Sequence, residues 1–158
     1  MVDQAPEIIE HSVGKRPFDP ADHGWDRDSG DRFVGQIGPI WRRMTDSREE
    51  FGFVAEEKHL NRNGNVHGGM LVALFDHALG QACYRLVGAD AALATIQINT
   101  QFMRLANPGD FVTASAEILR QTRSLLFIRG ECRVDREAIL AGDAMVKRTG
   151  QAHAAAGA

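Results

Sequence analysis

A long, mostly apolar segment runs through the middle of the chain, from Met70 to Val87. It is too long for a single strand and long enough for a helix. Gly88 follows it directly, and glycine is the residue that most often ends a helix. The pattern therefore predicts one helix of about 18 residues.

Shorter segments with a strand-like pattern lie on both sides of this helix. Phe51 to Glu56 alternates between apolar and polar residues, and Ile37 to Met44 can form a strand before it. After the helix, four strands are predicted: Leu93 to Met103, Phe111 to Leu119, Leu125 to Val134 and Ala138 to Lys147. Because the turns between them are too short for parallel crossovers, the sheet should be antiparallel. The sequence thus predicts an α+β fold, with an antiparallel sheet of about five to six strands wrapped around one long central helix.

The ends of the chain differ in character from this central unit. Residues 1–30 are polar and contain several prolines and glycines, so we expect an irregular lead-in with at most a short helix. Residues 31–150 form one domain, and residues 151–158 form a small-residue tail that should fray. Since a single apolar helix cannot cover all of the sheet, a homodimer or homotetramer is expected.

Composition and charge exclude several classes of protein. The chain is 44% hydrophobic and 25% charged, which is ordinary for a soluble globular protein, and its net charge of −3 argues against a nucleic-acid surface. No apolar run reaches the roughly 20 residues that cross a bilayer, and the N-terminus lacks the order of a signal peptide. The two cysteines, Cys83 and Cys132, have no metal-ligand spacing. We therefore expect free thiols, no metal and a cytoplasmic location.

Asp76 has unusual surroundings on the predicted helix. On a wheel at about 100° per residue, the other polar side chains form a solvated stripe: Tyr84, His77, Gln81 and Arg85. The opposite face carries the expected core residues: Leu71, Phe75, Ala78, Leu79, Ala82 and Leu86. Asp76 lies among small or apolar neighbours, where a carboxylate must be paired, or desolvated with a raised pKa, and such groups favour functional sites. The alternatives are an Asp bonded to a neighbouring strand, or one exposed through a gap between small residues.

The turn before the helix combines His67 with Gly68 and Gly69. Glycines let the backbone approach a ligand closely, and a helix N-terminus presents unpaired N–H groups with partial positive charge. Such groups can stabilise an oxyanion that forms on a carbonyl. The alternatives are that the glycines only make a tight turn and that His67 is a loop or packing residue.

Taken together, the segment from Asn61 to Gly69 and Asp76 resemble the signature of the hotdog-fold thioesterases. The resemblance is to the PaaI-like branch of the 4-hydroxybenzoyl-CoA thioesterase superfamily, which includes human thioesterase superfamily member 2. In that branch an Asn lies six residues before the His of a His-Gly-Gly turn and an Asp lies nine residues after it, and this chain matches all three positions. The similarity extends from about Phe33 to Lys147. It implies an acyl-CoA thioesterase with a hotdog fold and no cofactor.

The resemblance also implies roles for individual residues. Asp76 would be the catalytic general base or nucleophile, and Gly69, helped by Gly68, would polarise the thioester carbonyl through backbone N–H. Asn61 and His67 would orient water and the loop, and Thr95 would help to position water. The turn with Arg120, Arg123 and Ser124 resembles the basic turn that meets the CoA phosphates, since arginine pairs well with phosphate. The alternative is that these two arginines only solvate the end of a hairpin.

Other functions stay open at this point. The chain could be a non-catalytic acyl-CoA-binding homo-oligomer or, from the same fold, an enoyl-thioester hydratase or dehydratase. The acyl group is also open, because aromatic, short-chain and fatty groups all remain compatible. Asp76 lies seven residues beyond Gly69, which is about 10 Å along one helix. Since base and oxyanion donor must both reach the reacting atoms, the sequence predicts a site composed from two antiparallel copies.

Overall fold

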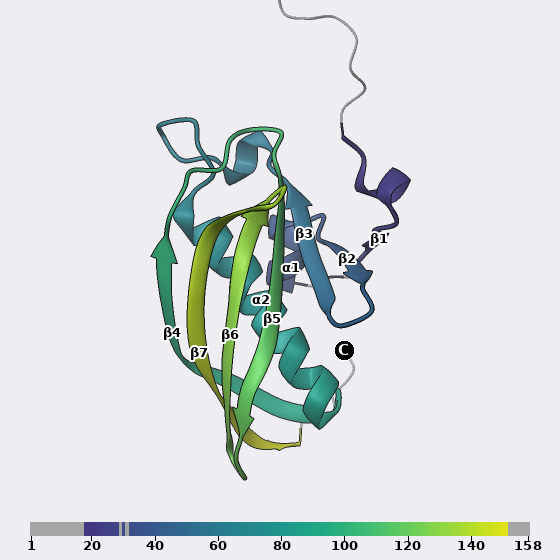
Figure 1. The fold of residues 1–158 in the computed structure, drawn as a ribbon, viewed down its shortest axis with the longest axis vertical. Coiled ribbons are helices and arrows are strands. Elements are labelled where there is room, and N and C mark those ends of the chain that lie inside the picture. Colours follow the sequence, from purple (N-terminus) through teal and green to yellow (C-terminus); the bar gives the residue numbers. More distant parts are fainter. Residues whose placement is uncertain (1–17, 29, 31, 152–158) are drawn as a thin grey trace, which may run out of the picture.

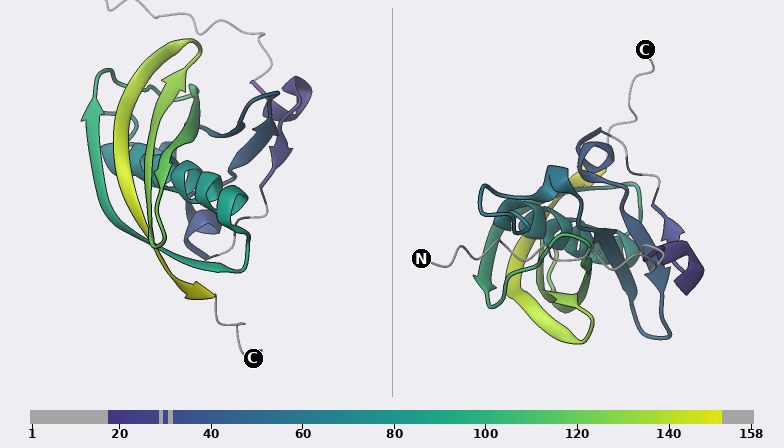
Figure 2. Two further views of the ribbon diagram at one scale, coloured as in Figure 1. Left: turned by 60° about the horizontal axis from the view of Figure 1, so that its bottom comes forward. Right: turned by 90° about the horizontal axis from the view of Figure 1, so that it is seen from above.

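In the computed structural model, residues 18–28, 30 and 32–151 are described. One twenty-residue helix, α2 (Gly68–Val87), lies along the inner face of a curved sheet (Figures 1 and 2). The strands are β1 (Asp26–Arg27), β2 (Trp41–Met44), β3 (Glu49–Val54), β4 (Ala91–Phe102), β5 (Phe111–Gln121), β6 (Leu125–Val134) and β7 (Glu137–Gln151). The short helices are η1 (Pro20–His23), α1 (Arg32–Ile37) and η2 (Glu57–His59). The predicted α+β class and the single long helix are confirmed.

Over the described residues, the sheet has seven antiparallel strands in the order β1-β2-β3-β5-β6-β7-β4. The expectation of five to six strands was therefore too low. The additional strand is β1, in which Asp26 and Arg27 pair with Arg42 and Trp41. Two polar residues show no alternation, so the hydrophobic pattern could not reveal this strand. The predicted lead-in thus joins the sheet through Asp26 and Arg27, whereas its residues 1–17 and 29 lie outside the described part.

The strand predicted from Ile37 to Met44 was wrong in its first half. Ile37 ends α1, and only Trp41–Met44 pairs in the sheet. Gly38 and Pro39 separate the two elements, and proline has no N–H to donate to a ladder. The apolar run therefore belongs to two elements.

The helix approaches the sheet closely because two glycines face it. Gly130 and Gly142 lie opposite each other on β6 and β7. A Cβ atom on Gly130 would lie 3.0 Å from the ring of Phe75, and one on Gly142 would lie 3.2 Å from it. The fully buried Phe75 ring takes up the space that side chains there would need. The α2 backbone ends as predicted at Gly88, whose φ is 95° and whose N–H donates to Tyr84 O at 2.8 Å.

Two residues of α2 differ in exposure from what the helical wheel predicted. Leu71, Phe75, Ala78 and Leu79 are buried as expected, but Leu86 is 48% exposed. His77, expected in solvent, is half-buried, and its Nε2 lies 3.0 Å from Asp28 Oδ2. The wheel treats the helix alone, whereas here the segment that contains Asp28 lies against His77.

Candidate active site

His67 caps the N-terminus of α2. Its Nδ1 accepts the N–H of Gly69 at 2.9 Å, and its carbonyl accepts the N–H of Met70 at 2.9 Å. The Gly68 N–H has no hydrogen-bond partner within residues 18–28, 30 and 32–151. Of the two glycines at this terminus, Gly68 therefore presents the free donor in the single chain, while the Gly69 donor is already engaged.

Asp76 and Thr95 come together although 19 positions separate them in the sequence. The Thr95 hydroxyl donates to Asp76 Oδ1 at 2.9 Å, which links the middle of α2 to β4. Asp76 is half-buried, and the chain opens around it, because a Cβ on Gly80, one turn further along, would meet no atom within 4 Å. This arrangement leaves the second carboxylate oxygen, Oδ2, without a protein partner among the described residues.

The Asn61 side chain stabilises the loop that follows it, residues 61–65. Its Oδ1 accepts the N–H of Asn63 at 2.8 Å and the N–H of Asn65 at 3.4 Å. The loop is closed by the Asn61 N–H, which donates to Asn65 O at 2.8 Å, and it is tied to the next turn by the Val66 N–H, which donates to Ala106 O. In this single chain the Asn61 side-chain oxygen is therefore committed to the loop that leads to His67.

The predicted oxyanion donor, Gly69, and the predicted base, Asp76, lie apart within one chain. Gly69 is in the first turn of α2 and Asp76 is two turns later, which corresponds to about 10 Å along the axis. Both face the same side of the helix as Ala73 and Gly80, since these positions recur at three- and four-residue spacing. No side chain longer than that of Asp76 projects from this strip of the helix surface.

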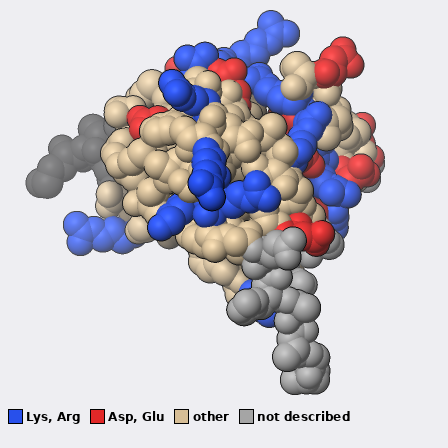
Figure 3. Space-filling model, turned by 90° about the horizontal axis from the view of Figure 1, so that it is seen from below, with Lys and Arg blue, Asp and Glu red and all other residues tan. Residues whose placement is uncertain are grey.

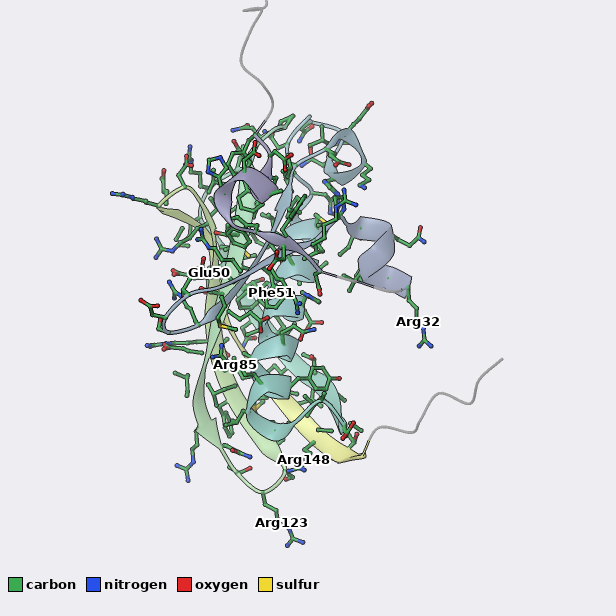
Figure 4. All side chains as sticks on the ribbon, turned by 90° about the vertical axis from the view of Figure 1, so that its right-hand side faces the viewer. Arg32, Glu50, Phe51, Arg85, Arg123 and Arg148 are labelled. Atoms are coloured by element: carbon green, nitrogen blue, oxygen red, sulfur yellow. The ribbon has the colours of Figure 1, made fainter. Side chains whose placement is uncertain are left out.

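The predicted substrate-binding arginines lie at the opposite end of the sheet from the α2 N-terminus, at the β5–β6 turn. Arg120, Arg123 and Ser124 are exposed, and neither arginine has an ion-pair partner among the described residues. Figure 4 shows Arg123 extending from this turn with Arg148 beside it, and Figure 3 shows basic side chains gathered at the centre of the lower face. This end of the molecule therefore presents uncompensated positive charge.

Arg148 is a residue that the sequence did not single out. Its N–H donates to Ser124 O at 2.8 Å, which places it against the predicted turn. In the pairing of β4 with β7, Thr95 lies opposite Val146 and Leu93 lies opposite Arg148. Because side chains two positions apart on a strand point to the same face, Arg148 lies on the face of the sheet that carries Thr95. Only the pairing of β4 with β7 reveals this relation, because the two strands are far apart in the chain.

Two hollows adjoin α2. One of about 270 Å³ lies at its N-terminal end and is lined by residues that include His67 and Gly69. The other, about 510 Å³, is lined by Phe51, Ala78, Arg85 and other residues, and Figure 4 labels Phe51 and Arg85. At about 100° per residue, Ala78 and Arg85 lie on the opposite side of α2 from Asp76. Only the first is lined by residues of the predicted site.

Burial makes both cysteines poor nucleophiles. It raises the pKa of the Cys83 thiol to about 11, with a further contribution from the negative charge of Asp76. It raises the pKa of Cys132 to about 12, and the Cys132 thiol donates to Leu71 O. Within the described residues no group of three His, Cys, Asp or Glu side chains could hold a metal ion, and no helix is long and apolar enough to span a membrane.

Native protein at pH 8 should therefore react very slowly with an aromatic disulfide reagent. The attacking species is the thiolate, and a thiol with a pKa near 11 is almost entirely protonated three units lower. Unfolding in denaturant should expose both thiols, so two equivalents should then react at once. Rapid, stoichiometric reaction of the native protein would contradict this prediction.

The sequence profile of the thioesterase superfamily matches residues 63–141. A Caenorhabditis elegans protein, F42H10.6, which carries the provisional name of an esterase, is 26% identical over 102 residues. The match covers 65% of this chain and 59% of that protein, so the chain spans less than two thirds of the relative's length.

Solved structures share the fold. A phenylacetic acid degradation-related protein of Ralstonia eutropha JMP134, provisionally named a thioesterase, is 26% identical, with a TM-score of 0.65 over 72% of this chain and 87% of that one. A hypothetical thioesterase of Streptococcus pneumoniae TIGR4, solved with coenzyme A, is 20% identical, with a TM-score of 0.62 over 72% of this chain and 91% of that one. These matches confirm the predicted hotdog fold and the predicted similarity to thioesterases related to phenylacetic acid degradation.

Proposed function

The chain belongs to the thioesterase superfamily, and from this premise we propose that it hydrolyses an acyl-CoA thioester to the free acid and CoA. The observation that carries the proposal is the Asp76–Thr95 pair. A carboxylate on the open strip of α2 is oriented by one hydroxyl at 2.9 Å, which leaves its other oxygen available for a substrate or a water molecule. That is the arrangement expected of a general base or a nucleophile.

In the general-base form, Asp76 takes a proton from water while the water oxygen attacks the thioester carbonyl carbon. The carbonyl oxygen becomes an oxyanion, and backbone N–H groups at a helix N-terminus stabilise it. The C–S bond then breaks, and the CoA sulfur leaves and takes up the proton. In the nucleophile form, an Asp76 oxygen attacks the carbonyl carbon, the C–S bond breaks and CoA leaves as the thiolate. Water then hydrolyses the resulting anhydride, which releases the free acid and restores the Asp76 carboxylate.

The hydrogen bonds at the start of α2 refine the choice of oxyanion donor. The resemblance assigns this role mainly to Gly69, but the Gly69 N–H donates to His67 Nδ1. The Gly68 N–H is free among the described residues and needs no rearrangement to donate. We therefore place Gly68 as the first donor, and Gly69 as a second one when His67 turns away.

The nucleotide end of CoA is proposed to bind at the β5–β6 turn. Arg120, Arg123 and Arg148 present positive charge there without carboxylate partners among the described residues. Guanidinium groups pair with phosphate through two parallel hydrogen bonds. The S. pneumoniae structure, which was solved with coenzyme A, supports a CoA ligand for this fold.

Arg123→Ala should raise KM for an acyl-CoA by about tenfold and leave kcat within about twofold, because a phosphate contact is the same in ground and transition states. Steady-state kinetics on an acyl-CoA and on the matching acyl-pantetheine, which lacks the nucleotide, measures this. Arg136→Ala, an equally exposed arginine at the β6–β7 turn, is the matched control. Equal losses on both thioesters would assign Arg123 to structure instead.

A panel of acyl-CoA thioesters with detection of released thiol tests the activity itself. The protein's own thiols should not interfere, given the raised pKa of both cysteines. Release of CoA supports the hydrolase. Hydration of an enoyl-CoA without CoA release would favour the hydratase, and tight binding without turnover would favour the acyl-CoA-binding homo-oligomer.

A further inference from the structure

The short helix α1 (Arg32–Ile37) forms a wall beside the N-terminal half of α2 (Figures 1 and 4). Val34 and Ile37 pack against the core from this helix. Phe33 does not: 64% of it is exposed. Single exposed apolar residues are common, so exposure alone does not indicate a role for Phe33. The evidence for a role is the hollow that its side chain lines.

Phe33 faces the hollow of about 270 Å³ at the N-terminus of α2. Phe33 and Ile37 line it from α1, and Met70 and Ala73 line it from α2. His67 and Gly69, which belong to the proposed site, are part of the same lining. An apolar hollow therefore adjoins the backbone donors that would hold the thioester carbonyl.

Hydrogen bonds from η2 fix this wall in place. His59 is 3% exposed, and its Nε2 donates to Ile37 O at 2.8 Å, while its Nδ1 accepts the N–H of Glu56 at 3.0 Å. The Lys58 ammonium donates to Gly38 O, directly after α1. The C-terminal end of α1 is thus held against η2 through buried or half-buried contacts.

The two basic side chains of η2 that line the hollow, Lys58 and His59, already have partners. Both ring nitrogens of His59 have partners, and burial lowers the pKa of His59, so the ring is neutral at physiological pH. Lys58 is bonded to Gly38 O and lies 3.2 Å from Glu56. A ligand in this hollow would therefore meet mostly apolar surface, with Gln36 and His67 as the other polar side chains, and this favours a hydrocarbon group over a charged one.

We propose that this hollow takes the acyl group and that Phe33 limits the size of acyl chain accepted; the inference rests on the proposed thioesterase function. At roughly 30 Å³ for each water-sized group, a hollow of about 270 Å³ that is open to solvent on one side holds at most about eight or nine carbon atoms within its lining. Phe33 bounds it by its side chain alone, so its substitution changes the space without disturbing the hydrogen bonds that hold α1.

The test is the chain-length profile of kcat/KM on straight-chain acyl-CoAs from acetyl to tetradecanoyl. The wild-type optimum is expected near octanoyl. Phe33→Ala should move it to chains about two to four carbons longer and raise the ratio of dodecanoyl to hexanoyl turnover at least about tenfold, as expected for methylenes in an apolar pocket. Phe33→Trp should move it towards shorter chains.

Phe18→Ala is the matched control. Phe18 is another aromatic of the lead-in, 41% exposed, and it packs on His23 and Phe111 instead of the hollow. Its loss should leave the profile unchanged, and thermal midpoints verify that all variants are folded. If the wild type hydrolyses acyl-CoA and both Phe33 variants keep its profile, the inference is overturned and the proposed function stands. If the wild type releases CoA from none of these thioesters, the inference is overturned, and the proposed function is overturned with it only if aromatic acyl-CoAs also release no CoA.

Discussion

Replacement of Asp76 by asparagine is expected to lower kcat by at least about a hundredfold while KM changes little. General-base assistance contributes roughly 10²–10⁴-fold in rate, and an amide can neither accept the proton from water nor attack as a carboxylate does. Asparagine keeps the size of the side chain and an oxygen that can accept the Thr95 hydroxyl proton, now donated at 2.9 Å. The substitution therefore removes charge while it preserves the contact between α2 and β4.

The alternative from the sequence, an Asp that serves only to bond a neighbouring strand, predicts a different outcome. The Thr95 contact is part of both readings, and they differ in the effect of removing the charge of Asp76. If Asp76 were structural, Asp76→Asn would lower the thermal midpoint, and activity would fall only with the folded fraction. In the catalytic reading, stability stays within about 0.5 kcal/mol of the wild type.

Thermal midpoint and kcat measured on the same preparation decide between these readings. Thr95→Val is the informative companion, because it removes the hydroxyl that orients Asp76 and leaves the carboxylate. It should lower kcat less than Asp76→Asn does. A well-folded Asp76→Asn protein that hydrolyses acyl-CoA at a near-normal rate would end the assignment of Asp76 as base or nucleophile.

Two inactive variants are expected to restore activity when they are combined in one oligomer. Gly69 and Asp76 are about 10 Å apart along α2, which is too far for one helix to present both a donor and a base to one carbonyl. The open strip around Gly80 would allow the helix of a second copy to approach. β4, at the edge of the sheet with Ile96 and Phe102 about half exposed, offers a further surface for that copy.

The experiment combines Asp76→Asn with Gly68→Pro. Gly68 is the first residue of α2, a position where proline is tolerated, and proline removes the N–H that is proposed to donate to the oxyanion. In random mixed dimers half of the molecules pair the two variants, and one of the two sites in each is intact. Refolding the variants together should thus restore about a quarter of wild-type activity, whereas each variant refolded alone stays inactive.

A mixture no more active than its components would place the whole site within one chain. Dilution gives a second measure, because the activity of a composite site should fall as the oligomer dissociates. Full activity per chain in a monomer at high dilution would contradict the composite site.

The sequence by itself determined the fold class and the positions of the main elements. The helix predicted from Met70 to Val87 follows from the length of the apolar segment and from Gly88 after it, and the structure starts it two residues earlier, at Gly68. The strand from Leu125 to Val134 was predicted with its observed bounds. The spacing of Asp76, His67 and the two glycines in the sequence also identified them as candidate site residues. The sequence did not reveal β1 or α1, because short polar or mixed segments carry no periodicity.

Only the tertiary structure decided what these residues touch. The Asp76–Thr95 bond, the His67 bond to Gly69 and the place of Arg148 beside the β5–β6 turn all depend on how separate elements pack. His77, predicted in solvent, pairs with Asp28, since a helical wheel contains no information on the segment that crosses it. Periodicity is a property of neighbouring residues, whereas an active site joins side chains from elements far apart in the chain. For that reason the sequence identified the candidate residues, and the structure supplied their partners.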